Sequence, residues 1–127
     1  MSAMTLTTRI ANVSKMIGDV DQFLRDLRNA PRQARDAHVL GWTNGLYVRM
    51  VKGEARATNV LNATVYPTHR VTGGFVVRNG SNERAALTPY EAAIDREINR
   101  QEDLHTWLCG QYRDLMEEAA AEHEGAL

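Results

Sequence analysis

The sequence predicts an α+β fold in which two long amphipathic terminal helices, packed as a hairpin or across an oligomer, flank a small antiparallel β-sheet of about three strands. Apolar residues near the N-terminus recur every three or four positions, and a proline-free stretch rich in Ala, Glu, Arg and Gln fills the last third of the chain. Between them, β-branched and aromatic residues form short runs separated by turn residues. With 127 residues, 43% of them hydrophobic, the chain has the length and the core residues of a single domain spanning 1–127.

The first helix is predicted over about residues 6–29. A threonine at position 5, 7 or 8 can cap its start, and Pro31 ends it, because proline disfavours helical geometry in the preceding residue. The apolar residues follow a 4-3-4-3-4-3 spacing, which gives three heptads of a helix-packing stripe. These residues are Leu6, Ile10, Val13, Ile17, Val20, Leu24 and Leu27.

The middle of the chain is predicted to be mostly β. Residues 31–40 are predicted to form a short helix that ends at Gly41, and residues 46–78 a small sheet region. Its strands are expected at 46–51, 59–66 and 71–78, with a turn at residues 52–54.

The last helix is predicted over about residues 89–124. Thr88 is the expected cap, Pro89 lies in the first turn and Glu91 closes a capping box. A helix of this length measures about 54 Å, whereas a compact globule of 127 residues has a radius of gyration of about 14 Å. It must therefore protrude, break near Gly110 or pack against a second copy. We favour the last, because an uncovered stripe exposes too much apolar surface.

The stripe of the last helix contains two polar positions, Gln101 and His105. Its members are Ile94, Ile98, Gln101, His105, Leu108, Tyr112, Leu115 and Ala119, extended by Leu104, Trp107 and Met116. The same heptads fit pairing within one chain and pairing between chains, so both remain open. The predicted oligomer interface consists of Ile10, Ile17, Leu24, Ile98, His105, Leu108 and Tyr112.

Only one group of residues suggests catalysis or metal binding. Glu102, His105 and Cys109 share one helical surface, and Glu-x-x-His occurs in di-iron bundles while His with Cys suits zinc. A di-iron site needs two such motifs, and no carboxylate or amide that would orient a Cys/His pair is identifiable. We interpret His105 and Gln101 as polar residues that set register, and Cys109 as a small buried hydrophobe. We therefore predict no enzyme activity, no catalytic residue, no metal and no cofactor.

The net charge of −1 hides an uneven distribution. Residues 25–84 carry ten basic and four acidic groups, and residues 85–127 carry three basic and ten acidic groups. Segments with opposite net charge suggest an anionic partner or charge pairing between subunits. In an alternating strand Tyr47 and Arg49 share a face, where an arginine fork can bind phosphate and an aromatic ring can stack on a base. The predicted ligand-binding residues are Tyr47, Arg49, Arg56, Arg70 and Arg78.

These observations favour a cytoplasmic, non-catalytic, self-associating protein whose arginine-bearing β-region binds nucleic acid or a nucleotide-like ligand. The single cysteine, the absence of a signal-peptide pattern and the absence of a long apolar run favour the cytoplasm and no membrane contact. The alternative is a virion or scaffold protein whose basic sheet and acidic helix pair between subunits, and a protein partner is a further possibility. The size and layout are typical of phage or mobile-element accessory proteins.

Overall fold

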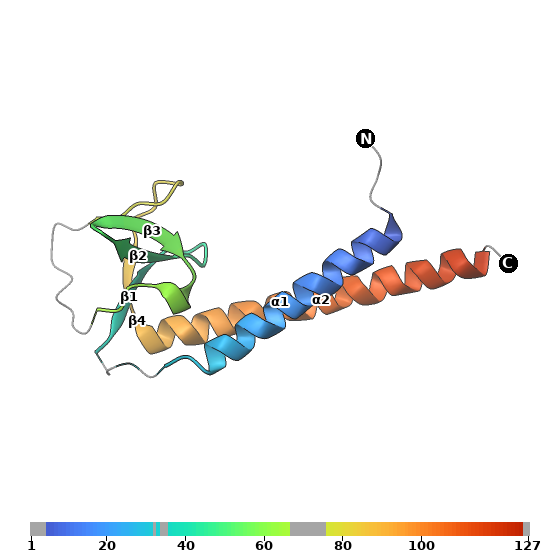
Figure 1. The fold of residues 1–127 in the computed structure, drawn as a ribbon, viewed down its shortest axis with the longest axis horizontal. Helices are drawn as coiled ribbons and strands as arrows, with labels where there is room; N and C mark the ends of the chain where they lie inside the picture. Colours follow the sequence, from blue (N-terminus) through green and yellow to red (C-terminus); the bar gives the residue numbers. More distant parts are fainter. Residues whose placement is uncertain (1–4, 32, 34–35, 67–75, 126–127) are drawn as a thin grey trace. The chain divides into compact units, whose positions relative to one another are not determined.

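The computed structural model describes residues 5–31, 33, 36–66 and 76–125 (Figure 1). In that part of the chain the elements are two α-helices, a four-stranded antiparallel sheet and a short 3-10 helix, which confirms an α+β fold. In chain order they are α1 (Leu6–Arg28), β1 (His38–Gly41), β2 (Tyr47–Val51), β3 (Glu54–Thr58), η1 (Val60–Asn62), β4 (Ala86–Pro89) and α2 (Tyr90–Gly125).

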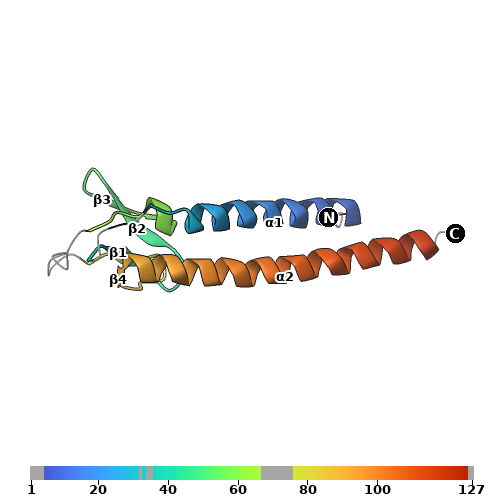
Figure 2. The ribbon, with the colours of Figure 1, turned by 90° about the horizontal axis from the view of Figure 1, so that it is seen from below.

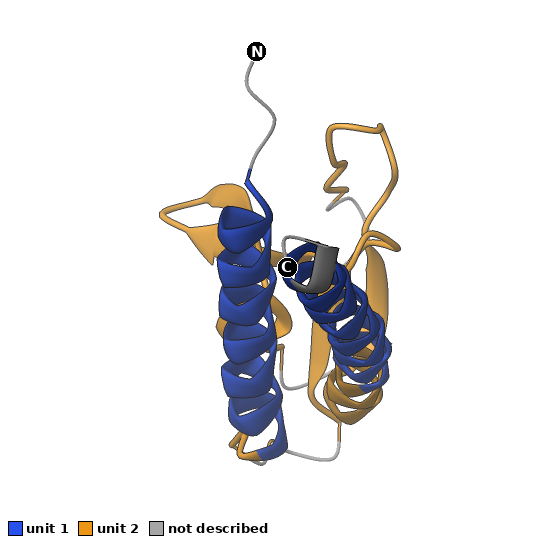
Figure 3. Ribbon diagram, turned by 90° about the vertical axis from the view of Figure 1, so that its right-hand side faces the viewer, with its two compact units in different colours: residues 1–28, 99–127 blue, residues 29–98 orange. Residues whose placement is uncertain are grey.

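The chain forms two compact units (Figure 3). The helical unit contains residues 1–28 and 99–127, and the sheet unit contains residues 29–98. α2 is one continuous helix whose first turns belong to the sheet unit, and Gly110 does not interrupt it.

The predicted first helix is confirmed. Thr5 caps α1, because its hydroxyl oxygen accepts a hydrogen bond from the backbone N–H of Thr8 at 3.2 Å. Every member of the predicted apolar stripe is buried or half-buried, and Val20, Leu24 and Leu27 are fully buried.

The helical unit pairs α1 with the C-terminal part of α2. Among the described residues, Arg9 forms an ion pair with Glu118 at 4.0 Å and Arg28 forms one with Glu102 at 3.1 Å, and His105 Nε2 lies 2.9 Å from Asp21 Oδ1. The residue numbers rise along α1 while those of the partners fall along α2, so the two segments run antiparallel (Figure 2).

The strand order in the sheet is β3-β2-β1-β4, with all pairs antiparallel. The predicted short helix over 31–40 is wrong at its described C-terminal end, because residues 38–41 form β1. This strand lies between β2 and β4 and is buried along its whole length. A central strand buried on both faces has no alternating pattern, so its sequence resembles a short helical segment.

The turn predicted at 52–54 is present, and it leads directly into a strand that the sequence did not indicate. Lys52 and Gly53 have φ angles of 52° and 81°, the left-handed geometry of a tight hairpin turn. The following β3 carries alanine, glutamate and arginine, which have low strand propensity, and it forms an exposed edge. The sheet therefore has four strands rather than about three.

The two other predicted strands differ from the structure. Within 59–66, Asn59 caps the 3-10 helix η1, and only Tyr66 forms a bridge, with His38. Most of the predicted strand 71–78 lies outside the described residues, and its last residue, Arg78, forms an isolated bridge with Arg84.

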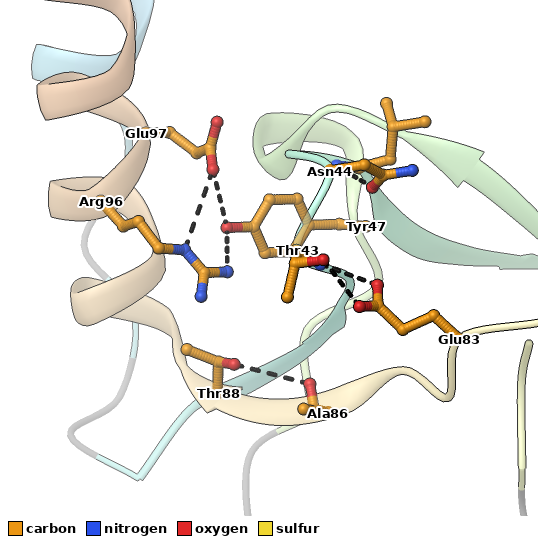
Figure 4. A network of polar contacts seen from close by, with 9 residues as sticks. Thr43, Asn44, Tyr47, Glu83, Ala86, Thr88, Arg96 and Glu97 are labelled. Carbon is orange, nitrogen blue, oxygen red and sulfur yellow. Dashed lines mark hydrogen bonds and ion pairs between the residues drawn. The ribbon is translucent and has the colours of Figure 1, made fainter. Parts of the chain in front are cut away.

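The core of the sheet unit includes a cluster of Leu40, Trp42 and Val48. Five half-buried residues pack against it, namely Met50, Tyr66, Val77, Ala85 and Leu87. Tyr47, the neighbour of Val48, projects from the other face of its strand toward the first turns of α2 (Figure 4).

The predicted long helix is confirmed, but its start differs from the predicted capping box. Thr88 and Pro89 belong to β4, and the Thr88 hydroxyl donates to the Ala86 carbonyl oxygen at 3.5 Å. The first N–H of α2, from Tyr90, donates to the carbonyl oxygen of Ala37 at 2.9 Å, so a backbone group of the sheet unit satisfies it. Over the described residues, neither helix combines the length and the apolar character needed to cross a bilayer.

Candidate functional site

Two pairs of exposed arginines lie directly opposite each other in the sheet unit. Arg49 on β2 is in register with Arg56 on β3, and Arg78 forms its bridge with Arg84. All four side chains are exposed. Like charges in directly opposed cross-strand positions destabilise a sheet by a few tenths of a kcal/mol up to about 1 kcal/mol. The fold itself therefore gives no reason for either pairing.

Little in the described part of the chain neutralises these charges. Arg56 contacts Glu54 at 3.8 Å, an exposed pair worth at most about 1 kcal/mol. Arg78 donates to the carbonyl oxygen of Asn82 at 2.9 Å, which holds the guanidinium but leaves its charge uncompensated. Among the described residues, the guanidinium groups of Arg49 and Arg84 form no hydrogen bond and no ion pair.

The structure brings together only part of the predicted ligand-binding set. Arg49 and Arg56 are neighbours, whereas Arg78 lies on the segment that precedes β4, a strand at the opposite edge of the sheet from β3. Arg70 falls outside the described residues. Arg84, which lies opposite Arg78, is not among the predicted ligand-binding residues.

Tyr47 is not a stacking platform, which corrects the prediction for this residue. Its side chain is 0% exposed, because the first turns of α2 cover the end of β2 where it lies. Arg49 lies two residues further along the strand and is exposed. Strand alternation correctly places Tyr47 and Arg49 on one face of β2, but it does not indicate that α2 covers this face at Tyr47.

Tyr47 instead belongs to a polar network with two residues of α2, the exposed Arg96 and the buried Glu97 (Figure 4). Its hydroxyl accepts a hydrogen bond from Arg96 Nη2 at 2.6 Å and donates to Glu97 Oε1 at 3.1 Å. The Arg96 guanidinium also lies 5.6 Å from the centre of the tyrosine ring. Burial raises the pKa of the Tyr47 phenol, so the hydroxyl stays protonated and continues to donate to the nearly buried Glu97. This network ties β2 to α2.

A second polar network holds the segment that carries Arg84. The carboxylate of Glu83 accepts hydrogen bonds from the backbone N–H of Thr43 at 2.9 Å and from its hydroxyl at 2.6 Å (Figure 4). These bonds hold the pKa of the Glu83 carboxyl below its usual range. The Glu83 carbonyl oxygen accepts from the indole of the buried Trp42 at 3.0 Å. Glu83 therefore fixes the backbone next to one of the arginine pairs.

The histidine of the long helix has a partner that the sequence did not reveal. His105 Nε2 lies 2.9 Å from Asp21 Oδ1, and His105 Nδ1 lies 3.7 Å from Cys109 Sγ. Asp21 lies on α1, far from His105 in the chain, so no local pattern indicates this carboxylate. Cys109 is exposed rather than buried, which corrects the prediction that it fills the core. Among the described residues, no group of three or more His, Cys, Asp or Glu side chains is arranged to hold a metal ion.

The residues of the predicted oligomer interface are largely covered within the single chain. Leu24 and Leu108 are buried, while Ile10, Ile17, Ile98, His105 and Tyr112 are half-buried. Ile98 belongs to the sheet unit, and the others belong to the helical unit. Larger apolar side chains outside the predicted set remain exposed on the helical unit, above all Trp107 at 59% and Met16 at 47%.

Comparison of the chain with protein-family models, with curated protein sequences and with solved structures yields no match.

Proposed function

We propose that this protein is a non-catalytic, self-associating binding protein whose sheet unit holds an anionic partner through its opposed arginines. The partner is a nucleic acid or a nucleotide-like ligand. The observation that carries the proposal is the register of Arg49 opposite Arg56, with both side chains exposed and their charges largely uncompensated.

A bound phosphate converts the repulsive pairing of Arg49 and Arg56 into an attractive one. Residues directly opposite in an antiparallel pair have Cβ atoms about 4.5–5.5 Å apart, so two long guanidinium side chains reach the same phosphate or adjacent ones. Each planar fork can bind phosphate oxygens with two parallel hydrogen bonds.

The charge of the two units supports the same partner. The sheet unit carries nine basic and six acidic groups, giving +3, while the helical unit carries six basic and ten acidic groups, giving −4. An anion is thus attracted to the sheet unit and repelled by the helical unit.

The helices supply the self-association in this proposal. α1 and α2 form a hairpin within one chain, and hairpins from different copies associate. We place the protein in the cytoplasm, with support from its single, exposed, free cysteine. A role as a phage or mobile-element accessory protein is supported by size and layout alone.

The test measures binding of a fluorescently labelled single-stranded oligonucleotide and of a labelled ATP analogue by fluorescence anisotropy. We expect the Arg49→Ala/Arg56→Ala variant to bind at least about 100-fold more weakly than wild type, because it loses two charge-assisted contacts that are each worth about 1.5–3 kcal/mol. The control is Lys15→Ala/Arg25→Ala, which removes two exposed positive charges from α1. Wild-type affinity in the Arg49/Arg56 variant, or an equal loss in the control, contradicts the proposal.

The opposite charges of the two units also favour a second function, a structural assembly protein. In that case the sheet unit of one copy binds the helical unit of another, and no nucleic acid is involved. Light scattering would show large homomeric assemblies with a 260/280 nm absorbance ratio typical of protein alone. High salt would dissociate them while the far-ultraviolet circular dichroism stays unchanged.

A further inference from the structure

The side chains of Arg78 and Arg84 project away from the apolar cluster of the sheet unit. Their chain neighbours Val77 and Ala85 pack against this cluster, which contains Val48, and the Ala85 N–H donates to the Val77 carbonyl oxygen at 2.8 Å. Because successive side chains of an extended chain point to opposite faces, the two arginines point the other way. Both arginines are exposed and both neighbours are half-buried, as this alternation requires.

Arg49 and Arg56 project from the same face of the sheet unit as the second pair. Val48 belongs to the apolar cluster and Met50 packs against it, so Arg49, which lies between them on β2, points away from it. Arg56 is the register partner of Arg49 and therefore shares its face. Both pairs of opposed arginines thus stand on one face of the sheet unit.

The two pairs lie diagonally across this face. Gly41 on β1 is in register with Tyr47 on β2 and with Ala86 on β4. Along the strands, Arg49 lies two residues to one side of this level and Arg84 lies two residues to the other side. Four residues along the strands and two strand spacings across them give a separation of about 16 Å. Strand side chains stand roughly perpendicular to the sheet, so one phosphate group does not contact both pairs.

Arg96 places a further guanidinium between the levels of the two pairs. Its Nη2 donates to the hydroxyl of Tyr47 at 2.6 Å, and the Arg96 side chain is exposed (Figure 4). Glu97 Oε1 lies 3.9 Å from Arg96 Nε and offsets part of this charge. We name the resulting row of exposed arginines the basic track, which consists of Arg56, Arg49, Arg96, Arg84 and Arg78.

The end of the basic track at Arg78 and Arg84 is held in place by the protein itself. Arg78 Nη1 donates to the carbonyl oxygen of Asn82 at 2.9 Å. The carboxylate of Glu83 accepts hydrogen bonds from the backbone N–H and the hydroxyl of Thr43, which fix the backbone beside Arg84. A ligand that binds here therefore does not have to order this backbone, which favours affinity.

We propose that the basic track binds the phosphate backbone of a polynucleotide, which contacts both arginine pairs at once. This proposal rests on the proposed function and narrows its partner to nucleic acid rather than a free nucleotide. Each strand of a B-form duplex carries one phosphate about every 3.4 Å along the axis, so a span of about 16 Å corresponds to about four or five phosphates. The phosphates of a mononucleotide are consecutive and reach one pair alone.

The test measures binding of a labelled twelve-nucleotide oligothymidylate and of a labelled ATP analogue by fluorescence anisotropy, for wild type and Arg78→Ala/Arg84→Ala. We expect the variant to bind the oligonucleotide at least about 100-fold more weakly, because two charge-assisted contacts are lost. Its slope of log K against log salt should be smaller in magnitude by about 1.4. Its affinity for the ATP analogue should stay within about 3-fold of wild type, because the intact pair at Arg49 and Arg56 suffices for a mononucleotide.

The matched control is Arg78→Lys/Arg84→Lys, which keeps both positive charges and should keep the wild-type salt slope. Circular dichroism verifies the fold of each variant. If Arg78→Ala/Arg84→Ala does not fold, Arg84→Ala alone serves as the test, since the Arg84 guanidinium forms no hydrogen bond or ion pair among the described residues. It should lower the magnitude of the slope by about 0.7. A twelve-base-pair duplex, titrated in parallel, shows whether a single strand or a duplex supplies the phosphates.

Wild-type affinity and salt slope for both nucleic-acid forms in the folded alanine variant overturn the basic track. An ATP analogue that binds wild type as tightly as the oligonucleotide does overturns it too. Both results leave the proposed function intact, because Arg49 and Arg56 still account for the bound anion. If Arg49→Ala/Arg56→Ala also binds both probes like wild type, the proposed function fails together with the basic track.

Discussion

Gly41 lies against the buried Tyr47 ring so closely that the position has no room for a methyl group. A Cβ atom at Gly41 would lie 2.6 Å from both Tyr47 Cδ1 and Tyr47 Cε1, well inside van der Waals contact. The ring cannot move aside freely, because Tyr47 is fully buried and its hydroxyl is bonded to Arg96 and Glu97. Gly41→Ala therefore either strains the core, at about 1–3 kcal/mol, or displaces the ring and leaves Glu97 without the tyrosine hydroxyl, at a further cost of about 1–3 kcal/mol.

We expect Gly41→Ala to lower the free energy of unfolding by about 3 kcal/mol and the melting temperature by roughly 10 °C for a chain of this size. Circular dichroism during urea and thermal unfolding measures both. The matched control is Gly18→Ala in α1, where a Cβ meets nothing within 4 Å and an exposed helical glycine becomes alanine. Gly18→Ala should raise the free energy of unfolding by up to about 1 kcal/mol. A Gly41→Ala variant within about 0.5 kcal/mol of wild type refutes the packing described for Tyr47.

Three further predictions test other parts of the structure. Tyr47→Phe removes the hydroxyl's hydrogen bonds with Arg96 and with the buried Glu97 and should cost about 1–2 kcal/mol in urea unfolding, whereas no loss would show that the network does not stabilise the fold. The lowered pKa of Glu83 means that its contribution to stability is present above the unfolded-state value, near 4.5, and is lost as the pH falls through the folded-state value. Thermal melts between pH 3 and 7 should therefore show a smaller acid-induced loss of stability in Glu83→Gln than in wild type, and identical pH profiles would contradict this. The exposed Cys109 should react with iodoacetamide in wild type and in His105→Gln at rates within about 3-fold, and a more than 10-fold drop in the variant would indicate an activated thiol and contradict the non-catalytic proposal.

The sequence predicted the helices well because the information for a helix is local. The 4-3 spacing in α1 and α2 identified residues that are all buried or half-buried in the structure, whereas the three residues predicted to extend the α2 stripe, Leu104, Trp107 and Met116, are exposed. Thr5, one of three predicted caps, caps α1. The predicted cap at Thr88 was wrong. The first backbone N–H of α2, from Tyr90, donates instead to the carbonyl oxygen of Ala37, which lies far away in the chain.

The sheet and the site were predicted only in part, because their decisive contacts are non-local. β1 is a strand because it lies between two partners, and β3 is a strand because a tight turn returns it onto β2, although its residues have low strand propensity. The burial of Tyr47 depends on where α2 crosses the sheet, and the proximity of Asp21 to His105 depends on the pairing of the two helices. The opposition of Arg49 and Arg56 follows from the turn at residues 52 and 53, so a sequence reading that extended β3 from this turn could have found it.

The salt dependence of oligonucleotide binding by wild type and by Arg49→Ala/Arg56→Ala tests most directly whether the opposed arginines bind phosphate. For single strands, each phosphate contact contributes about −0.7 to the slope of log K against log salt. Anisotropy titrations between about 50 and 200 mM salt should give a steep negative slope for wild type and a slope smaller in magnitude by about 1.4 for the variant. A flat wild-type response, or the same slope in both proteins, would contradict the account that the opposed arginines of the sheet unit bind phosphate.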